Sequence, residues 1–391
     1  MKFRLAFIIE IPVIAALLFS CNNSGNLIGI DHYQNRFNTT PHHCMLPAAG
    51  SDTSYQAVVA TGSGPYLFVG ESDEITCMSL ILFDIDPDSN VLDSATVTLQ
   101  LIDVIGTSSS QFALNIHILQ TPWEESDTEW GAFSSAYLGE PDSTVILTIS
   151  ELPDDTTDVS FRFHLPLPWI KHWQDTLDAI PNYGMAFTTD ASFIAVFGSA
   201  ESSDQPLLSV YSHAEGDTSV IDRHTYPMHD VFIPGTFQES TSDFLYVSNG
   251  LGFRSLLYFD ISSIPETATI NQAQIHLKQD STLTFPHWNA GSNLSLTCVS
   301  VTETPWPFPE IPYDSLYTGY GLAYGDSAVI NITTLVQLWS SGEKQNHGVM
   351  IKGTSEAYDI SGAAFYTTAS DSLNRPFLEL YYSVPDMNNG Q

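Results

Sequence analysis

Basic residues are scarce in this chain. Lys and Arg total 11 of 391 residues, against 45 Asp and Glu, and the formal net charge is -34. A field of that sign repels phosphate backbones, anionic lipid and anionic polysaccharide, which argues against nucleic-acid binding. The ordinary role of such an acidic surface is solubility. Apolar residues are not scarce, because they make up 43% of the chain, and this favours a folded protein over a disordered one.

Cysteine is also rare. The four cysteines are Cys21, Cys44, Cys77 and Cys298. If Cys21 carries lipid, as argued below, an odd number remains for an oxidising compartment. The one pairing that we consider is Cys44 with Cys77. Cys298 alternates with leucines along a strand pattern and is expected to be a small core residue.

Long hydrophobic runs are missing as well, and the longest marks a secretion signal. Residues 1–21 combine the charged Lys2 and Arg4 with an apolar segment at 11–19, which is too short for a membrane-spanning helix. The segment ends in Leu-Phe-Ser-Cys, which resembles the bacterial lipobox, with Cys21 as the residue that is lipidated. Asn22 follows, where an inner-membrane retention signal would have Asp. The sequence therefore predicts an outer membrane lipoprotein that faces the cell surface or the periplasm.

Recognisable catalytic motifs are missing too. The sequence has no Gly-x-Ser-x-Gly elbow, no His-Glu-x-x-His and no phosphate-binding loop. Nothing singles out a pair of carboxylates for acid–base chemistry. The interpretation is a non-catalytic protein that requires no cofactor.

The clearest positive feature is the apolar stretch 254–265, because the first half of the chain contains a degenerate copy at 79–85. Ser255 aligns with Ser79 and Leu257 with Ile81. Both faces of the stretch are apolar, which predicts a central strand covered on both sides.

The rest of the chain follows as two copies of one unit, with offsets between 164 and 183 residues for matched segments. Short alternating strands between turn residues are typical of β-sandwiches. We therefore predict an all-β protein of two tandem jelly-roll-like antiparallel β-sandwiches, each with one short helix, near residues 169–177 and 333–339. The predicted divisions are a signal peptide at 1–21, a flexible tether at 22–54, sandwiches at 55–212 and 222–384, a linker at 213–221 and a tail at 385–391.

The order of motifs in the second copy also resembles a known family. A Ser-Leu-Leu-Tyr-Phe-Asp strand, Thr-Pro-Trp, a Thr-Thr-Leu-Val-Gln-Leu-Trp helix, Asn-His-Gly and Arg-Pro-Phe-Leu-Glu-Leu-Tyr occur in that order. This is similar to the DNRLRE-type domain, a bacterial surface β-sandwich related to the alginate-binding carbohydrate-binding modules. The resemblance implies the fold and a surface role. It does not extend to alginate, because recognition of carboxylates needs Lys and Arg, and the string Asp-Asn-Arg-Leu-Arg-Glu is absent.

Aromatic residues in loops are the candidates for stacking on a neutral glycan. Those chosen are Trp306, Phe308, Tyr313, Tyr317 and Tyr320 in the second copy and Trp123 and Trp130 in the first. Because Trp123 and Trp306 repeat between the copies, packing against their own sandwiches is the favoured alternative for these two.

Two polar segments raise the question of a metal. Asp84, Asp86, Asp88 and Asn90 alternate as in a calcium loop, but the glycine and closing glutamate of such a loop are absent, so a solvated turn is favoured over a structural calcium site. Asp222, His224, His229 and Asp230 gather where the two copies join, where ordinary loop residues are again favoured.

Three hypotheses for function follow. The first is a lipid-anchored envelope protein whose sandwiches bind a neutral glycan or mediate adhesion. The second is a structural component of an envelope or extracellular assembly, with an envelope protein as partner. The third is a surface polysaccharide hydrolase or lyase with an unrecognised site.

Overall fold

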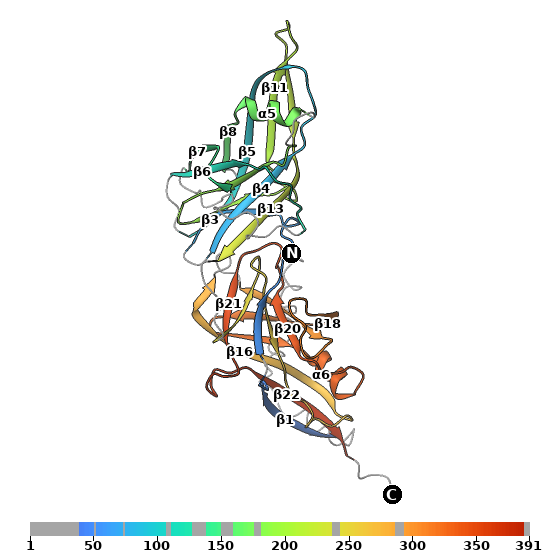
Figure 1. Cartoon of the computed structure of the whole chain (residues 1–391). Coiled ribbons are helices and arrows are strands. Elements are labelled where there is room, and N and C mark those ends of the chain that lie inside the picture. The colour runs from blue at the N-terminus through green and yellow to red at the C-terminus, as the bar shows by residue number, and fades with distance from the viewer. Residues whose placement is uncertain are drawn as a thin grey trace, which may run out of the picture.

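The structure is a computed structural model that describes residues 39–50, 52–72, 75–106, 111–126, 138–149, 159–175, 181–236, 243–285 and 293–386. The predicted signal peptide with Cys21, and the candidate Trp130, lie outside these residues. The described residues form two lobes of antiparallel strands, which confirms the all-β prediction (Figure 1). Of the helices in the described residues, none is long and apolar enough to cross a bilayer.

The first sandwich is a curled sheet of eleven strands. These strands are β3 (Tyr66–Glu71), β4 (Ile75–Phe83), β5 (Val91–Ile105), β6 (Gln111–Ile118), β7 (Ser143–Thr148), β8 (Val159–His164), β9 (Met185–Thr188), β10 (Ile194–Gly198), β11 (Leu207–His213), β12 (Val220–Thr225) and β13 (Pro227–Thr236). Its described helix, α5 (Leu167–Gln174), buries Ile170 and Trp173. The main core of this sandwich is rich in phenylalanine, including Phe68, Phe187 and Phe197.

The second sandwich is also a curled sheet of eleven strands. These are β1 (Thr39–Pro47), β2 (Asp52–Gln56), β14 (Phe244–Ser248), β15 (Phe253–Leu257), β16 (Thr269–Phe285), β17 (Leu294–Val301), β18 (Tyr313–Tyr324), β19 (Ser327–Asn331), β20 (Val349–Gly353), β21 (Gly362–Tyr366) and β22 (Phe377–Pro385). Helix α6 (Thr333–Ser340) buries Trp339 in its core, as expected. Thr333 begins this helix but does not cap it, since the N-cap residue is Ile332 and no side chain caps the helix. Thr333 Oγ1 instead accepts a hydrogen bond from Ala273 N of β16 (2.9 Å).

The predicted central strands are confirmed. In β15, Leu257 packs into the main core of the second sandwich, while Leu256 packs into a smaller cluster on the opposite face. In β4, Ile81 and Leu80 divide in the same way. A strand with a packed cluster on each side needs apolar residues at consecutive positions, which is why this stretch stands out in the sequence.

The same polar contact also occurs at equivalent places in the two sandwiches. Asn182 donates from Nδ2 to Phe83 O (2.8 Å), and Asn346 donates in the same way to Phe259 O (2.8 Å). Each asparagine accepts a hydrogen bond from the glycine two residues later. Gly184 and Gly348 have φ of 79° and 96°, a region that favours glycine. The repeated Asn-x-Gly motif is therefore a repeated turn.

The predicted domain boundaries are wrong in one respect. β1 and β2 lie in the second sandwich, where β1 pairs with β22 and β2 with β15. β12 and β13 lie in the first sandwich, where β12 pairs with β11 and β13 with β4. In Figure 1, blue β1 lies beside red β22, and yellow β13 lies beside blue β4. We call residues 39–56 the first arm and residues 220–236 the second arm.

The first strand of each arm, β1 or β12, has few apolar side chains by which the sequence could reveal it. Most β1 side chains are exposed, and so are those of β12. Strands at the border of a sheet carry polar residues on exposed positions and show no sustained apolar period. Residues 39–54 therefore read as a tether, and residues 213–221 as a linker.

Candidate glycan-binding face

The outward side chains of five neighbouring strands in the second sandwich form the candidate site. The strands lie in the order β1, β22, β16, β19 and β18. Their inward residues, such as Ile275, Ile330 and Leu378, fill the core. Alternation along each strand turns the intervening residues to the other side. We call these residues the outer face: His43, Met45, Gln274, His276, Tyr320, Leu322, Tyr324, Val329, Asn331, Phe377, Glu379 and Tyr381.

The strand register aligns these residues in rows across the sheet. One row runs from Phe377 through His276 and Val329 to Leu322. The next runs from Glu379 through Gln274 and Asn331 to Tyr320, which is 65% exposed. An apolar row thus lies beside a row of amide, carboxylate and phenol groups. Such a surface can stack on a ligand and hydrogen-bond to it.

Glu379 is the centre of the polar contacts on this face. Its Oε1 lies 3.0 Å from His43 Nε2 and accepts from Tyr381 Oη at 3.1 Å, and its Oε2 lies 3.1 Å from His276 Nε2. Partial burial acts to raise the pKa of Glu379, but the hydrogen bonds from His43 and Tyr381 and the nearby His276 outweigh it, and the net shift is downward. Glu379 is therefore a carboxylate that fixes three neighbouring side chains.

Ring stacking fixes the same side chains further. The rings of His43 and Tyr381 stack with centroids 4.4 Å apart, and those of His276 and Phe377 stack at 4.6 Å. On β18, Tyr320 and Tyr324 are 65% and 71% exposed and stand four residues apart, roughly 13 Å along the strand. The face therefore combines held rings on β22 and β16 with open rings on β18.

Among its described residues, the first sandwich carries fewer aromatic rings at the matching positions. At the matching register, Thr96 and Thr98 of β5 lie opposite Ser209 and Leu207 of β11, and Arg162 of β8 pairs with Thr98. Tyr211 is the counterpart of Tyr381 there, with Asp222 as its partner on β12, and two histidines also lie at matching positions, His224 opposite Ser209 and His164 opposite Thr96. The candidate site thus belongs to the second sandwich.

The two repeated tryptophans are structural. Trp306 donates from Nε1 to His347 O (2.9 Å), and Trp123 donates to Tyr183 O (2.8 Å). Each packs against the smaller apolar cluster of its own sandwich. Both acceptor residues precede the glycine of an Asn-x-Gly turn, so these tryptophans hold equivalent turns.

The other predicted aromatic residues divide between two places. Tyr320 is on the outer face. Tyr317 is half-buried with Lys344 Nζ 4.9 Å from its ring centroid. Phe308 packs edge-on against Tyr55 of β2, 5.6 Å between centroids, and Tyr313 begins β18, 40% exposed. Of the predicted aromatic residues, Tyr320 alone therefore belongs to the face, and it lies on a strand and not in a loop.

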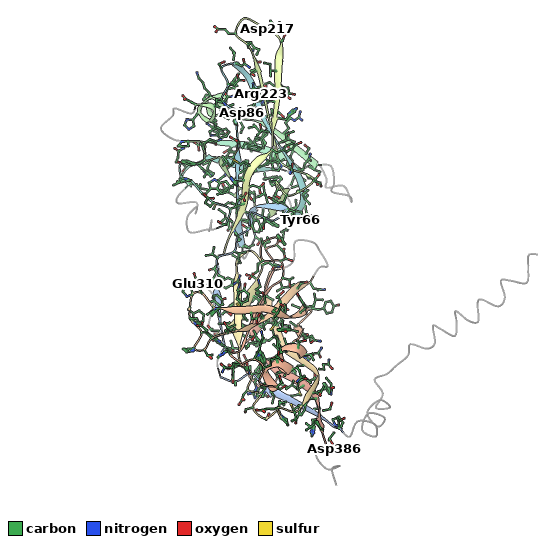
Figure 2. The ribbon with its side chains drawn as sticks, turned by 90° about the vertical axis from the view of Figure 1, so that its right-hand side faces the viewer. Tyr66, Asp86, Asp217, Arg223, Glu310 and Asp386 are labelled. Carbon is green, nitrogen blue, oxygen red and sulfur yellow. The ribbon has the colours of Figure 1, made fainter. Side chains whose placement is uncertain are left out.

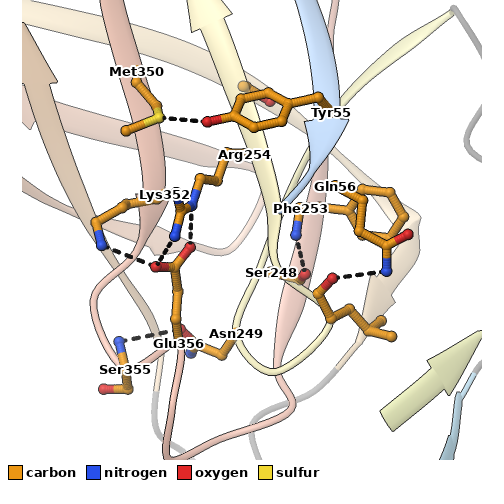
Figure 3. Close-up of polar contacts among 12 residues, drawn as sticks. Tyr55, Gln56, Ser248, Asn249, Phe253, Arg254, Met350, Lys352, Ser355 and Glu356 are labelled. Carbon is orange, nitrogen blue, oxygen red and sulfur yellow. Dashed lines mark hydrogen bonds and ion pairs between the residues drawn. The ribbon is translucent and has the colours of Figure 1, made fainter. Parts of the chain in front are cut away.

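Tyr55 belongs to a polar cluster on the opposite side of the second sandwich (Figure 3). Arg254 donates to both carboxylate oxygens of Glu356, at 2.8 and 2.9 Å, and Lys352 Nζ lies 2.9 Å from the same group. The Glu356 side chain is 8% exposed. The cluster ties β15 and β20 to the loop before β21, which is a structural role.

The candidate metal residues are not brought together. Asp88 accepts hydrogen bonds from Asn90 N (3.0 Å) and from the Asn90 side chain, and its Oδ2 lies 3.0 Å from Arg223 Nη1. Figure 2 labels Asp86 and Arg223 in the first sandwich. Across the described residues, no group of three or more His, Cys, Asp or Glu could hold a metal ion. Asp84 and Asp86 lie with Asp88 in the segment that connects β4 to β5.

The junction residues separate into two pairs. On β12, His224 Nε2 lies 3.3 Å from Asp222. On β13, His229 Nδ1 lies 3.2 Å from Glu125, while the buried Asp230 accepts a hydrogen bond from Ala200 N (2.7 Å). The two pairs occupy different strands and do not form one site.

The proposed Cys44–Cys77 disulfide is wrong, because Cys44 lies on β1 of the second sandwich and Cys77 on β4 of the first, and both are free thiols. Cys298 is fully buried, as expected. Burial raises the pKa of the Cys298 thiol.

Sequence reasoning missed most of the outer face. Of its candidates, Tyr320 is on this face. The signal available for the rest was the alternation in β18, β19 and β22, which places every second residue on one face. Comparison with known proteins gives no further guide, since no family model and no curated protein matches this chain.

Proposed function

We propose that the second sandwich binds a neutral glycan on its outer face. The observation that carries this proposal is the exposure of Tyr320 and Tyr324 beside the polar row of Glu379, Gln274 and Asn331. Rings stack on the apolar faces of sugars. Amide groups donate hydrogen bonds to sugar hydroxyls and accept them, and carboxylates accept them. The resemblance to DNRLRE-type surface domains supports the same function.

Charge directs the proposal to neutral ligands. The chain carries a formal net charge of -34. On the outer face Glu379 adds a carboxylate, and the nearby Lys278 is paired with Asp326. An anionic polysaccharide would meet repulsion here without cations to offset it. We therefore place neutral polysaccharides ahead of uronic-acid polymers.

The proposal includes a place in the cell envelope. The charged start, the apolar segment and the Leu-Phe-Ser-Cys ending at Cys21 support a lipid anchor. Such an anchor would hold the sandwiches at a bacterial outer membrane. Metabolic labelling with a fatty-acid analogue, compared between the chain and Cys21→Ser, tests this part independently.

A glycan array followed by titration tests the binding. We expect a neutral glycan to bind the chain. Tyr320→Ala and Tyr324→Ala should each raise its Kd about fivefold, which corresponds to about 1 kcal/mol per lost ring contact. Tyr211→Ala, at the matching place in the first sandwich, is the control and should bind normally. Equal binding by all four proteins would refute the assignment of the face.

A further inference from the structure

The two arms are exchanged between the two sandwiches. Each arm precedes one set of nine strands in the sequence but completes the other set. The first arm precedes β3 to β11 and pairs with β22 and β15 of the second sandwich. The second arm precedes β14 to β22 and pairs with β11 and β4 of the first. Since β11 matches β22 and β4 matches β15, both arms occupy equivalent places.

This arrangement means that each acceptor place recognises an arm that arrives from elsewhere in the chain. The strand pairings of the first arm with the second sandwich depend on β22 and β15, and they do not require the arm to belong to the same molecule. Exchange of an identical element between copies keeps the same contacts and changes only the connection, so it costs little free energy. The same place can therefore accept the first arm of another copy.

The first arm is the more weakly packed of the two. In β13 of the second arm, Val231, Phe232 and Ile233 are at most 1% exposed. In β2, by contrast, every residue is at least partly exposed, although Tyr55 packs against the smaller cluster. The rest of the first arm contributes the half-buried Cys44 and Leu46 and the small buried Ala48 to the core. Dissociation of the first arm therefore exposes less apolar surface to water than dissociation of the second arm would.

Hydrogen bonds make the first arm specific for its place. Asp52 accepts from Thr368 N (2.6 Å) and Thr368 Oγ1 (2.8 Å). Ser54 Oγ lies 3.0 Å from Ser255 Oγ and accepts from Tyr246 N at 2.7 Å. Gln56 Nε2 donates to Leu251 O at 2.9 Å (Figure 3). A second copy would bring the same groups.

The connection from the first arm to β3 contains a turn that can serve as the hinge. Residues 57–65 cross from the second sandwich to the first, and Gly64 N donates to Thr61 O within this segment. A Cβ at Gly64 would lie 2.5 Å from Ala357 O, so the closed chain needs glycine here for a close approach. A short connection that must fold back tightly is the kind that opens in strand exchange.

We propose that the first arm passes between copies, so that β1 and β2 of one chain complete the second sandwich of another and link the chains. The partner is a second copy of this chain. On a cell surface such links would present several outer faces together and would raise the avidity for a repetitive ligand.

The test uses three cysteine variants of the full chain in which Cys21 and Cys44 are changed to Ser. His43 and Tyr381 are direct partners across β1 and β22, a separation that a disulfide can bridge. One variant carries His43→Cys, the second Tyr381→Cys and the third both. The third should form an intrachain disulfide at low protein concentration, which shows that the substituted chains fold.

The single variants are then unfolded together, refolded at low and high concentration and oxidised. We expect a covalent dimer of the two variants that increases with concentration and a matching dimer mass in solution. The matched control replaces the second variant by Tyr211→Cys, whose partner is Asp222, and it should give severalfold less dimer. Equal yields from the two mixtures, or no covalent dimer while the double variant still forms its intrachain disulfide, would overturn the proposal.

Discussion

Ser79 and Ser255 make the same buried hydrogen bond in the two sandwiches. Ser79 Oγ donates to Phe68 O at 2.9 Å, and Ser255 Oγ donates to Tyr246 O at 2.8 Å. Both serines lie in central strands, and both acceptors lie in the strand that precedes in the sequence. Ser255 has an additional contact, to Ser54 Oγ of the first arm.

Because of this additional contact, we expect replacement of Ser255 to lower the free energy of unfolding more than replacement of Ser79. Ser79→Ala should lower the free energy of unfolding by about 1 kcal/mol, because one buried carbonyl loses its donor. Ser255→Ala should cost more, about 2 kcal/mol, because Ser54 on the arm also loses a partner. Denaturant unfolding followed by fluorescence measures both. An equal loss in the two variants would contradict the role of Ser255 in holding the arm.

We expect a larger loss of stability when the Arg254–Glu356 ion pair is broken. Glu356→Gln removes the charge that Arg254 and Lys352 share in a site where the Glu356 side chain is 8% exposed. A buried guanidinium without its carboxylate should cost about 3 kcal/mol of stability. Lys352→Met is the matched control, and it should cost about 1 kcal/mol or less because Arg254 and Glu356 stay paired. Thermal unfolding that ranks the two variants in the opposite order would contradict this view.

We expect Asp230 to make the stability of the first sandwich depend on pH. Burial, with Glu201 and Glu125 nearby, raises the pKa of Asp230 from 3.8 to about 8, although the N–H of Ala200 opposes the shift. Between these pKa values the unfolded chain releases a proton that the folded chain keeps. The contribution of Asp230 to stability therefore falls as pH rises from about 4 to 8 and stays low above 8.

The variant Asp230→Asn isolates this effect. It should match the parent chain in acid and become more stable than the parent as pH rises toward 8, by a few kcal/mol at most. Unfolding curves at several pH values measure the difference. Asp222→Asn, on the exposed β12, is the matched substitution at an exposed position. A constant difference between Asp230→Asn and the parent across pH would rule out the raised pKa.

We expect replacement of the repeated tryptophans to lower stability without changing glycan affinity. Trp306→Phe and Trp123→Phe each remove an indole N–H that a backbone carbonyl accepts, and each should cost about 1 kcal/mol of stability. Neither residue is on the outer face, so glycan affinity at a temperature where the variant is folded should not change. Loss of affinity in Trp306→Phe without loss of stability would return this residue to the candidate site.

The sequence predicted much of the framework because local patterns reflect burial. Leu256 and Leu257 are consecutive and apolar because a packed cluster lies on each side of β15. Trp173 and Trp339 mark the short helices because bulky rings at helical spacing fill the core beside them. Trp123 and Trp306 repeat because equivalent turns need the same support.

The outer face could be predicted only in fragments. Its residues come from five strands, and their register depends on pairings as distant as His43 with Tyr381. Alternation in one strand tells which side chains point outward but not which strand lies next to it. The loop around Trp306 was therefore chosen over Glu379 and Phe377 of β22.

The all-β architecture, the central strands and the short helices could be predicted from the amino-acid sequence, since each depends on residues close together in the chain. The places of the arms and the set of side chains that meet on the outer face depend on pairings between distant strands, and only the fold reveals them. An exposed border strand such as β1 has few apolar residues to mark it, and its place depends on the unpaired backbone groups of a distant strand. Those groups are the same in every sequence, so only the folded chain reveals which of them become partners.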